Sequence, residues 1–280
     1  QFEGVVAGNE VLAANLQELL NPPVNETRDK WEQEHLERER QHEKEKSERK
    51  RKRTEWIEGL RANPGIVRNP PDVPPGEWTN DQYWLLLELD GEGLRTSRAK
   101  GSNWHSLVDE FGEDVALAFR DAAIKHWRSY RPELGSEGAD WSSTPYSLIF
   151  AMLGLEYESN EVDSFPFNLS EAEVSLALRY LTGELNGFPS WLETMHKAYP
   201  EQVLKAVWQE LHWELVNTRV DNPMHYILQD IVYHAPWLHG QLTPLLQQWI
   251  EENPDSDWEV LRHCFHILDT EQVPLEWLTS

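Results

Sequence analysis

The feature that most limits how this chain can fold is a long polar stretch, residues 27–61. Between Glu26 and Ala62 there are 12 Lys/Arg and 11 Asp/Glu, so the stretch is close to neutral, whereas the rest of the chain holds 13 basic and 38 acidic residues. No apolar side chain stands between Glu37 and Glu55. A coiled coil needs apolar a and d positions sustained over several heptads, so the sequence excludes that structure here and predicts a solvent-exposed single helix.

Oppositely charged side chains recur in this stretch at helical spacing: Glu34 with Arg38, Glu45 with Arg49, Glu48 with Lys52, Glu37 with Arg40, and Glu43 with Lys46. Each such pair adds about 0.2–0.5 kcal/mol to an isolated helix. The basic run 49–53 lies toward the C-terminal end, where the helix dipole favours cations. A helix of about 35 residues would span roughly 50 Å, and apolar Trp56, Ile57 and Leu60 predict that its last turns dock on a folded body.

The composition divides the chain into four parts. Residues 1–25 read as the end of an upstream element, because their one short amphipathic helix has little to pack on and the start resembles an excerpt from a longer chain. Residues 26–63 form the charged helix, and residues 64–77 carry five prolines, which predicts an extended, semi-rigid connector and the main internal boundary. Residues 78–280 form an acidic domain rich in Trp.

Helical periodicity continues through residues 78–280 and no segment alternates as a strand. Ser170 with Glu173 three residues later predicts a capping box, and Pro200, Pro244 and Pro254 are expected at or just before helix starts. The fold class is therefore all-α. Two similar joints, 196–201 and 249–255, favour an irregular HEAT-like α-solenoid over a non-repeating helical bundle, which stays open as the alternative.

Composition also limits the partners. A formal net charge of −24 argues against a nucleic-acid-binding body and against adsorption to an anionic membrane. The single Cys264 cannot form an internal disulfide, which fits a reducing cytoplasm. Most of the 14 Trp are expected in helix packing, with a minority as interface anchors.

Motifs for enzyme chemistry were not found. There is no Gly-x-x-x-x-Gly-Lys-Ser/Thr loop and no Gly-x-Gly-x-x-Gly, and Gly91–Gly93 places a carboxylate where a phosphate would have to approach. The Ser-rich residues 141–144 lack a nucleophile elbow. No catalytic or cofactor-binding residue is assigned, and no cofactor is expected.

Three histidine groups invite a metal interpretation and none has the spacing of a zinc site. His263, Cys264 and His266 do not share a helix face well, and no second ligand pair follows them. His234 with His239, and His212 with Glu214, match no zinc-hydrolase motif. All are interpreted as structural residues, so no metal ligand is assigned.

Three blocks of the sequence carry a resemblance to one protein family. They are residues 111–132, residues 143–155, and residues 179–191 (Arg-Tyr-Leu-Thr-Gly-Glu-Leu-Asn-Gly-Phe-Pro-Ser-Trp). They resemble the C-terminal helical regions of large bacterial NACHT/STAND-type NTPases associated with anti-phage defence, over roughly residues 26–280. The resemblance implies a sensor or scaffold segment whose NTPase and effector lie elsewhere in the parent chain. No NTPase residue can be carried over, because the phosphate loop is absent here.

The leading hypothesis is a non-catalytic, cytoplasmic interaction scaffold or sensor segment of a larger multidomain bacterial protein, binding its own upstream domains and a protein partner. One alternative is an enzyme whose His/carboxylate site is assembled from several helices. Another is a nucleic-acid contact through the basic run 49–53, against which the interleaved acidic residues and the acidic body argue.

Overall fold

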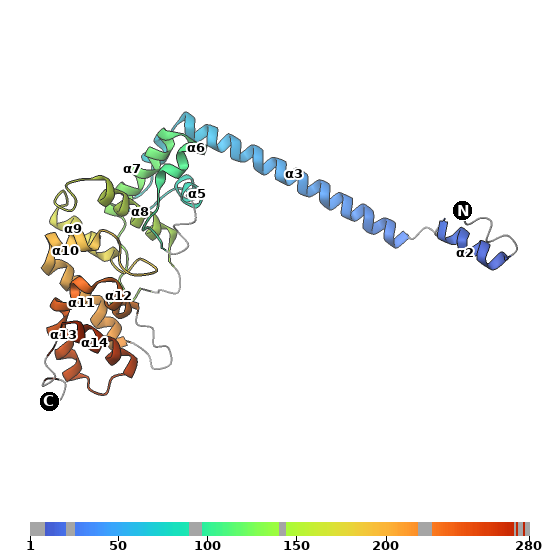
Figure 1. Ribbon diagram of the computed structural model, residues 1–280. Helices are drawn as coiled ribbons and strands as arrows, with labels where there is room; N and C mark the ends of the chain where they lie inside the picture. The colour runs from blue at the N-terminus through green and yellow to red at the C-terminus, as the bar shows by residue number, and fades with distance from the viewer. Residues whose placement is uncertain are drawn as a thin grey trace. The chain divides into compact units, whose positions relative to one another are not determined.

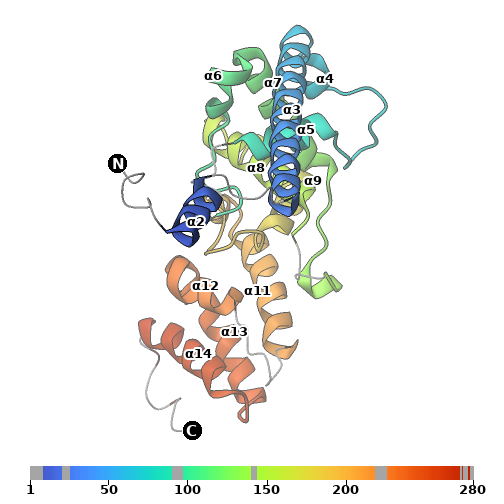
Figure 2. The same cartoon turned by 90° about the vertical axis from the view of Figure 1, so that its right-hand side faces the viewer.

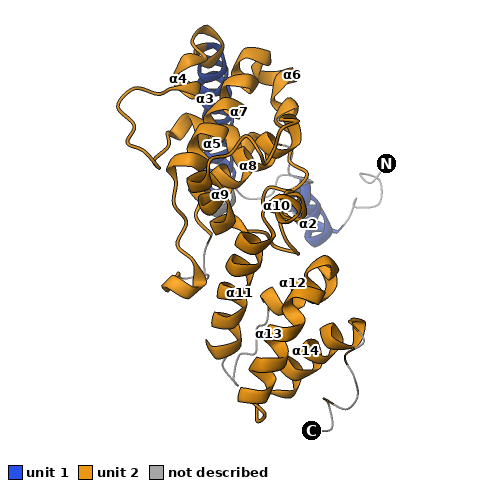
Figure 3. Ribbon diagram, turned by 90° about the vertical axis from the view of Figure 1, so that its left-hand side faces the viewer, with its two compact units in different colours: residues 1–58 blue, residues 59–280 orange. Residues whose placement is uncertain are grey.

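The computed structural model describes residues 9–20, 26–89, 97–139, 144–217, 226–271, 273 and 277, and these contain helices, turns and no strand (Figure 1). The all-α prediction is confirmed. Contacts divide the chain into two units, residues 1–58 and residues 59–280 (Figure 3). In the described part of the chain, no helix has both the length and the apolar composition that crossing a bilayer requires.

The first unit consists of α2 (Glu10–Leu20) and most of α3 (Glu26–Ala62). As the charge pattern predicts, α3 is a continuous helix of 37 residues, about 55 Å long at 1.5 Å per residue. The Lys46 Nζ lies 3.9 Å from Glu43 Oε1, and the Arg51 Nη1 lies 2.7 Å from Glu55 Oε1. All four side chains are more than half exposed, so each pair adds only tenths of a kcal/mol.

The second unit begins within the last turn of α3. Leu60 is buried there, and the Arg61 guanidinium donates to the backbone carbonyl of Glu110 at 2.8 Å. The proline-rich connector 64–77 belongs to this unit, where it forms α4 (Gly65–Arg68) against α7. Arg68 pairs with Asp121 at 2.8 Å. The division by contacts therefore falls at residue 58, ahead of the connector.

The first half of this unit is built around the helix pair α7 (Glu113–Ser129) and α8 (Tyr146–Glu161), which make the most extensive contact in the fold. Gly154 lets the two backbones approach closely, since it lies directly against the backbone of Ala123 and Ile124. The smaller elements that complete this half are α5 (Asn80–Glu88), η2 (Trp104–Leu107), α6 (Val108–Phe111), η3 (Gly135–Glu137), α9 (Glu171–Ala177) and η4 (Leu178–Tyr180).

The second half contains α10 (Leu192–Ala198), α11 (Pro200–Asn217), α12 (Tyr226–His234), η5 (Pro236–Leu238), α13 (His239–Glu252) and α14 (Trp258–Thr270). In Figure 2 the orange and red helices α12, α13 and α14 form one cluster. Contacts between successive helices (α7 with α8, α10 with α11, α13 with α14) make this unit an array of helices, and the solenoid remains a prediction.

Of two helix starts predicted from local sequence, one agrees with the structure and one does not. The predicted capping box at Ser170 is present, because its side chain accepts from the Glu173 N–H while the Glu173 carboxylate accepts from Ser170 N–H. The start predicted at Pro244 is wrong, because α13 begins at His239 and contains this proline. His239 and Leu242 are buried ahead of Pro244, so packing extends the helix past the position that local propensity favours.

Candidate interaction surface

The side chains of the three histidine groups considered as metal ligands lie in different surroundings. In α14, His263 and Cys264 are buried whereas His266 is exposed, so the side chains do not converge. Burial raises the pKa of the Cys264 thiol to about 12, which keeps it neutral and a poor ligand near neutral pH. Among the residues that the structure describes, no three His, Cys, Asp or Glu side chains gather as a metal ion would require.

The other two histidine groups lie apart as well. His239 is buried and hydrogen-bonds to the Ile231 carbonyl and to Thr270 Oγ1, at 3.0 and 2.9 Å, while His234 is exposed at the end of α12. His212 is exposed on α11 and Glu214 is buried. The glycine cluster 91–93 and residues 141–143 of the Ser-rich loop lie outside the described residues.

Among the described residues of the second unit, five glutamates are buried, which sequence reasoning did not predict: Glu156, Glu158, Glu184, Glu210 and Glu214. A buried carboxylate is costly unless hydrogen bonds or an opposite charge compensate it. Such groups are also the natural candidates for an acid/base site. Their hydrogen-bond partners therefore decide between a structural and a catalytic role.

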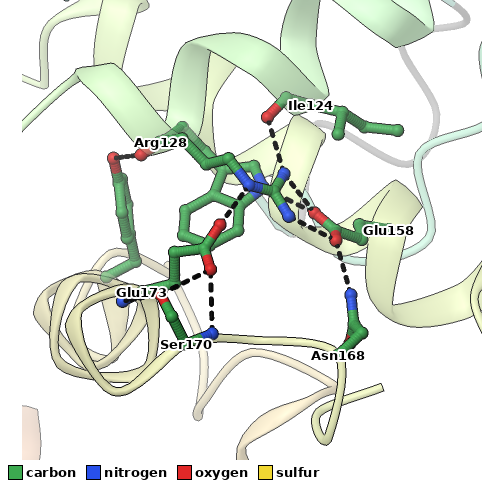
Figure 4. Close-up of polar contacts among 8 residues, drawn as sticks. Ile124, Arg128, Glu158, Asn168, Ser170 and Glu173 are labelled. Atoms are coloured by element: carbon green, nitrogen blue, oxygen red, sulfur yellow. Dashed lines mark hydrogen bonds and ion pairs between the residues drawn. The ribbon is translucent and has the colours of Figure 1, made fainter. Parts of the chain in front are cut away.

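Glu158 lies in a polar network between α7, α8 and the start of α9 (Figure 4). The Arg128 guanidinium donates to both Glu158 oxygens, at 2.7 and 2.6 Å, and to Glu173 at 2.6 Å. Trp127 Nε1 and Asn168 Nδ2 also donate to Glu158, each at 2.9 Å. Both carboxylates are thus occupied by internal donors, and the network joins three elements.

Glu184 is saturated by donors from residues 97–100. Ser97 Oγ and the backbone N–H groups of Arg98, Ala99 and Lys100 donate to its two oxygens over 2.7–3.1 Å. The neighbouring Glu156 accepts from Ser190 Oγ at 2.7 Å. Burial raises the pKa of Glu156, and the nearby Glu184 charge adds to that. The space that Glu156 and Glu184 line together with Met152 is too small to hold a water molecule.

Glu214 and Glu210 are likewise used to hold backbone segments. Glu214 accepts from the N–H groups of Ile227 and Leu228 at 2.8 and 2.9 Å, which ties α11 to the start of α12. Burial raises its pKa to about 7 although these donors oppose the shift. Glu210 accepts from the hydroxyl and N–H of Ser136 next to a cavity of about 300 Å³. These contacts fix loops and helix ends.

The arrangement closest to the His/carboxylate alternative is a cavity of about 250 Å³ beside the proline connector, lined in part by His126 and Glu77. Burial lowers the pKa of His126 to about 4, so the ring is neutral near pH 7. Its Nε2 hydrogen-bonds with the Ser147 carbonyl at 3.2 Å, and its ring lies within 5.2 Å of the Phe150 ring centroid. His126 is thereby engaged in packing against Phe150 and in a hydrogen bond to the backbone.

An aromatic cluster on α5 and the start of α8 exposes large apolar side chains to solvent. Tyr83 contacts Trp78, Trp84 and Tyr146, with ring centroids 5.6, 5.3 and 5.3 Å apart and the rings arranged edge to face. Trp84 is 52% exposed, Tyr146 47% and Leu87 43%. We call Tyr83, Trp84, Leu87 and Tyr146 the aromatic patch.

The sequence of α5 explains why this patch faces outward. Gln82, Leu85 and Leu86 form the buried face of the helix, and the Gln82 amide donates to the Val67 carbonyl at 2.8 Å. Trp84 and Leu87 occupy the opposite side, one turn apart. The side chains beneath the patch are packed against one another, since Trp78 stacks on Phe150 with ring centroids 5.3 Å apart. The patch is therefore a fixed surface in which large apolar side chains meet solvent.

In comparisons with protein-family models, curated proteins and solved structures, nothing matches the chain. The resemblance to helical regions of bacterial defence NTPases therefore rests on the quoted sequence blocks alone.

Proposed function

We propose that this chain is a non-catalytic protein-interaction module and that the aromatic patch is its docking surface. The observation that carries the proposal is the exposure of Trp84 and Tyr146 on a rigid support. Trp and Tyr dominate the residues whose truncation weakens protein complexes most, because they supply a large contact area with few rotatable bonds. An exposed apolar cluster on a folded unit is a typical docking surface.

The buried polar groups support the same function. Glu158, Glu184 and Glu214 are each held by internal donors that connect separate elements. Their hydrogen bonds make the second unit a stiff support, and a stiff surface loses little conformational entropy when it binds. The interaction role agrees with the sensor or scaffold role that the sequence resemblance implies. Within that role, α3 acts as a charged spacer ahead of the second unit.

Affinity capture from bacterial cells, with and without phage infection, tests the proposal. The bait is the full chain as wild type, as Trp84→Ala/Tyr146→Ala, and as Trp258→Ala. Trp258 is the matched control, because it is an exposed Trp (65%) on α14. We expect a specific protein partner that is retained by Trp258→Ala and lost by the double variant. Identical capture by all three baits would refute the patch as the docking surface, and reproducible turnover of a substrate would refute a non-catalytic role.

A further inference from the structure

We infer that the cavity between η3, α9–η4 and α11 is a binding site for a small aliphatic carboxylate. The cavity lies outside the aromatic patch, so the inference goes beyond the proposed function and does not depend on it. Three observations support it: the size and apolar wall of the cavity, the internal partners of three charged side chains in that wall, and the available donors of a fourth, Arg131.

The cavity has the size and the wall of a small-molecule site. Its volume is about 300 Å³, at the lower end of the range of roughly 300–1,000 Å³ that ligand pockets occupy. Leu134, Leu178 and Leu181 are buried, so they form a packed apolar surface. The apolar side chains of the wall are Leu134, Ala172, Leu176, Leu178, Leu181 and Ala206. Such a wall fits an aliphatic tail.

Three of the four charged side chains in the wall already have partners within the fold. Glu210 is 1% exposed, and its carboxylate accepts from the N–H and the hydroxyl of Ser136 and from Gln209 Nε2. Arg179 Nη1 donates to Glu137 Oε1 at 2.9 Å, and Arg179 Nη2 donates to the other Glu137 oxygen. The charges of Glu137 and Arg179 therefore compensate each other.

Arg131 is the fourth charged side chain, and its donors are available to a ligand. Its Nη2 lies 3.7 Å from Glu137 Oε1, which is longer than a hydrogen bond, and the closer Arg179 donors occupy both Glu137 oxygens. The Arg131 side chain is 70% exposed, and within the described part of the chain its guanidinium donates no hydrogen bond. A guanidinium binds a carboxylate through two parallel N–H donors. A ligand carboxylate would therefore supply the acceptors that Arg131 lacks.

The acidic excess of the second unit does not oppose this choice of ligand. Residues 59–280 hold 14 Lys/Arg and 35 Asp/Glu, but exposed charges more than about 8 Å apart are largely screened at physiological salt. The charges in the wall therefore decide which ligand binds. A cationic ligand would meet Arg131 and would find both wall carboxylates, Glu137 and Glu210, already hydrogen-bonded.

Isothermal titration calorimetry on the full chain tests this chemistry. The ligands are octanoate, octylamine, which has the same tail length and a cationic head, and acetate, which has the carboxylate without the tail. The proteins are wild type, Arg131→Gln, Ala206→Leu, which places a larger side chain in the wall, and the control Arg262→Gln. Arg262 is an exposed Arg (53%) that pairs with Glu259 on α14, outside the cavity. Circular dichroism and urea unfolding verify that each variant is folded.

We expect octanoate to bind at one site per chain and acetate to bind more weakly by about tenfold or more, because acetate has no tail to bury. Octylamine should not bind. Arg131→Gln should weaken octanoate binding roughly tenfold, as expected for the loss of a charged hydrogen-bond donor, and Ala206→Leu should weaken it by filling the cavity. Arg262→Gln should bind as wild type does. Absence of octanoate binding, equal binding of octylamine, or an affinity that Arg131→Gln leaves unchanged would overturn the inference.

One further variant separates this site from the docking surface. Trp84 and Tyr146 are not part of the cavity wall, so Trp84→Ala/Tyr146→Ala should bind octanoate with the affinity of wild type. Loss of octanoate binding in this variant would place the ligand at the aromatic patch and overturn the inference. The capture experiment does not depend on either result, because it measures a protein partner at the patch.

Discussion

The closest approach in the fold, where α8 crosses α7 at Gly154, gives the sharpest stability prediction. A Cβ added at Gly154 would lie 1.9 Å from the carbonyl oxygen of Ala123 and 2.2 Å from its carbonyl carbon. Ordinary contact begins at 3.4 Å, so in Gly154→Ala the helices would have to separate by about 1.5 Å. The obstacle is backbone, which no change of rotamer can relieve.

The magnitude follows from two opposing effects. Alanine in a helix interior gains about 1 kcal/mol over glycine in propensity. Overpacking a core costs about 1–3 kcal/mol even where side chains can adjust. Since α7 and α8 form an extensive helix contact and the clash is with backbone, we expect a cost at the upper end of this range and a net loss of about 2 kcal/mol.

Gly59→Ala is the matched control within the same chain. Gly59 is also helical, near the end of α3, and an added Cβ there meets no atom within 4 Å. We expect this variant to be more stable than wild type by about 0.5–1 kcal/mol. Urea unfolding followed by Trp fluorescence measures both changes, because Trp127 on α7 is buried in the core at this crossing. If Gly154→Ala is as stable as Gly59→Ala, the packing argument is refuted.

Two further predictions concern buried charges. Arg128→Ala should destabilise the unit by about 3 kcal/mol, because it leaves the Glu158 carboxylate, 5% exposed, without its cation; adding Glu158→Gln should recover part of this in urea unfolding. Because burial raises the folded-state pKa of Glu214 to about 7, from 4.5, this group should lower stability by about 3 kcal/mol as pH rises from 4.5 to 7. Glu214→Gln should remove that slope, and an identical pH dependence in both proteins would contradict the assignment.

Helix content and the exposed charged helix could be predicted from the sequence, because both depend on local patterns. The stretch between Glu37 and Glu55 lacks any apolar residue, so it had to be exposed, and α3 is the expected continuous helix. The Ser170 capping box follows from residues only three apart. The start of α13 could not be predicted this way, because the burial of His239 and Leu242 in the folded unit outweighs the local signal of Pro244.

The sequence of α5 contains a signal for the exposed aromatic patch. Residues 83–89 are apolar at six of seven positions, which is more than one buried face of a helix needs. The excess must lie on an exposed side, and in α5 it is Trp84 and Leu87 that do so. The pairing of α5 with Tyr146 across more than 60 residues of chain is tertiary, so periodicity alone could not show the cluster.

The buried glutamates show how so acidic a unit can fold. With 35 acidic and 14 basic residues, most carboxylates cannot have a cationic partner. Glu184 and Glu214 accept instead from backbone N–H groups of residues 98–100 and 227–228. These donors need satisfaction in any case, so the arrangement stabilises the loop and the helix start without using Lys or Arg. The fold thus compensates these buried carboxylates with backbone donors instead of cations.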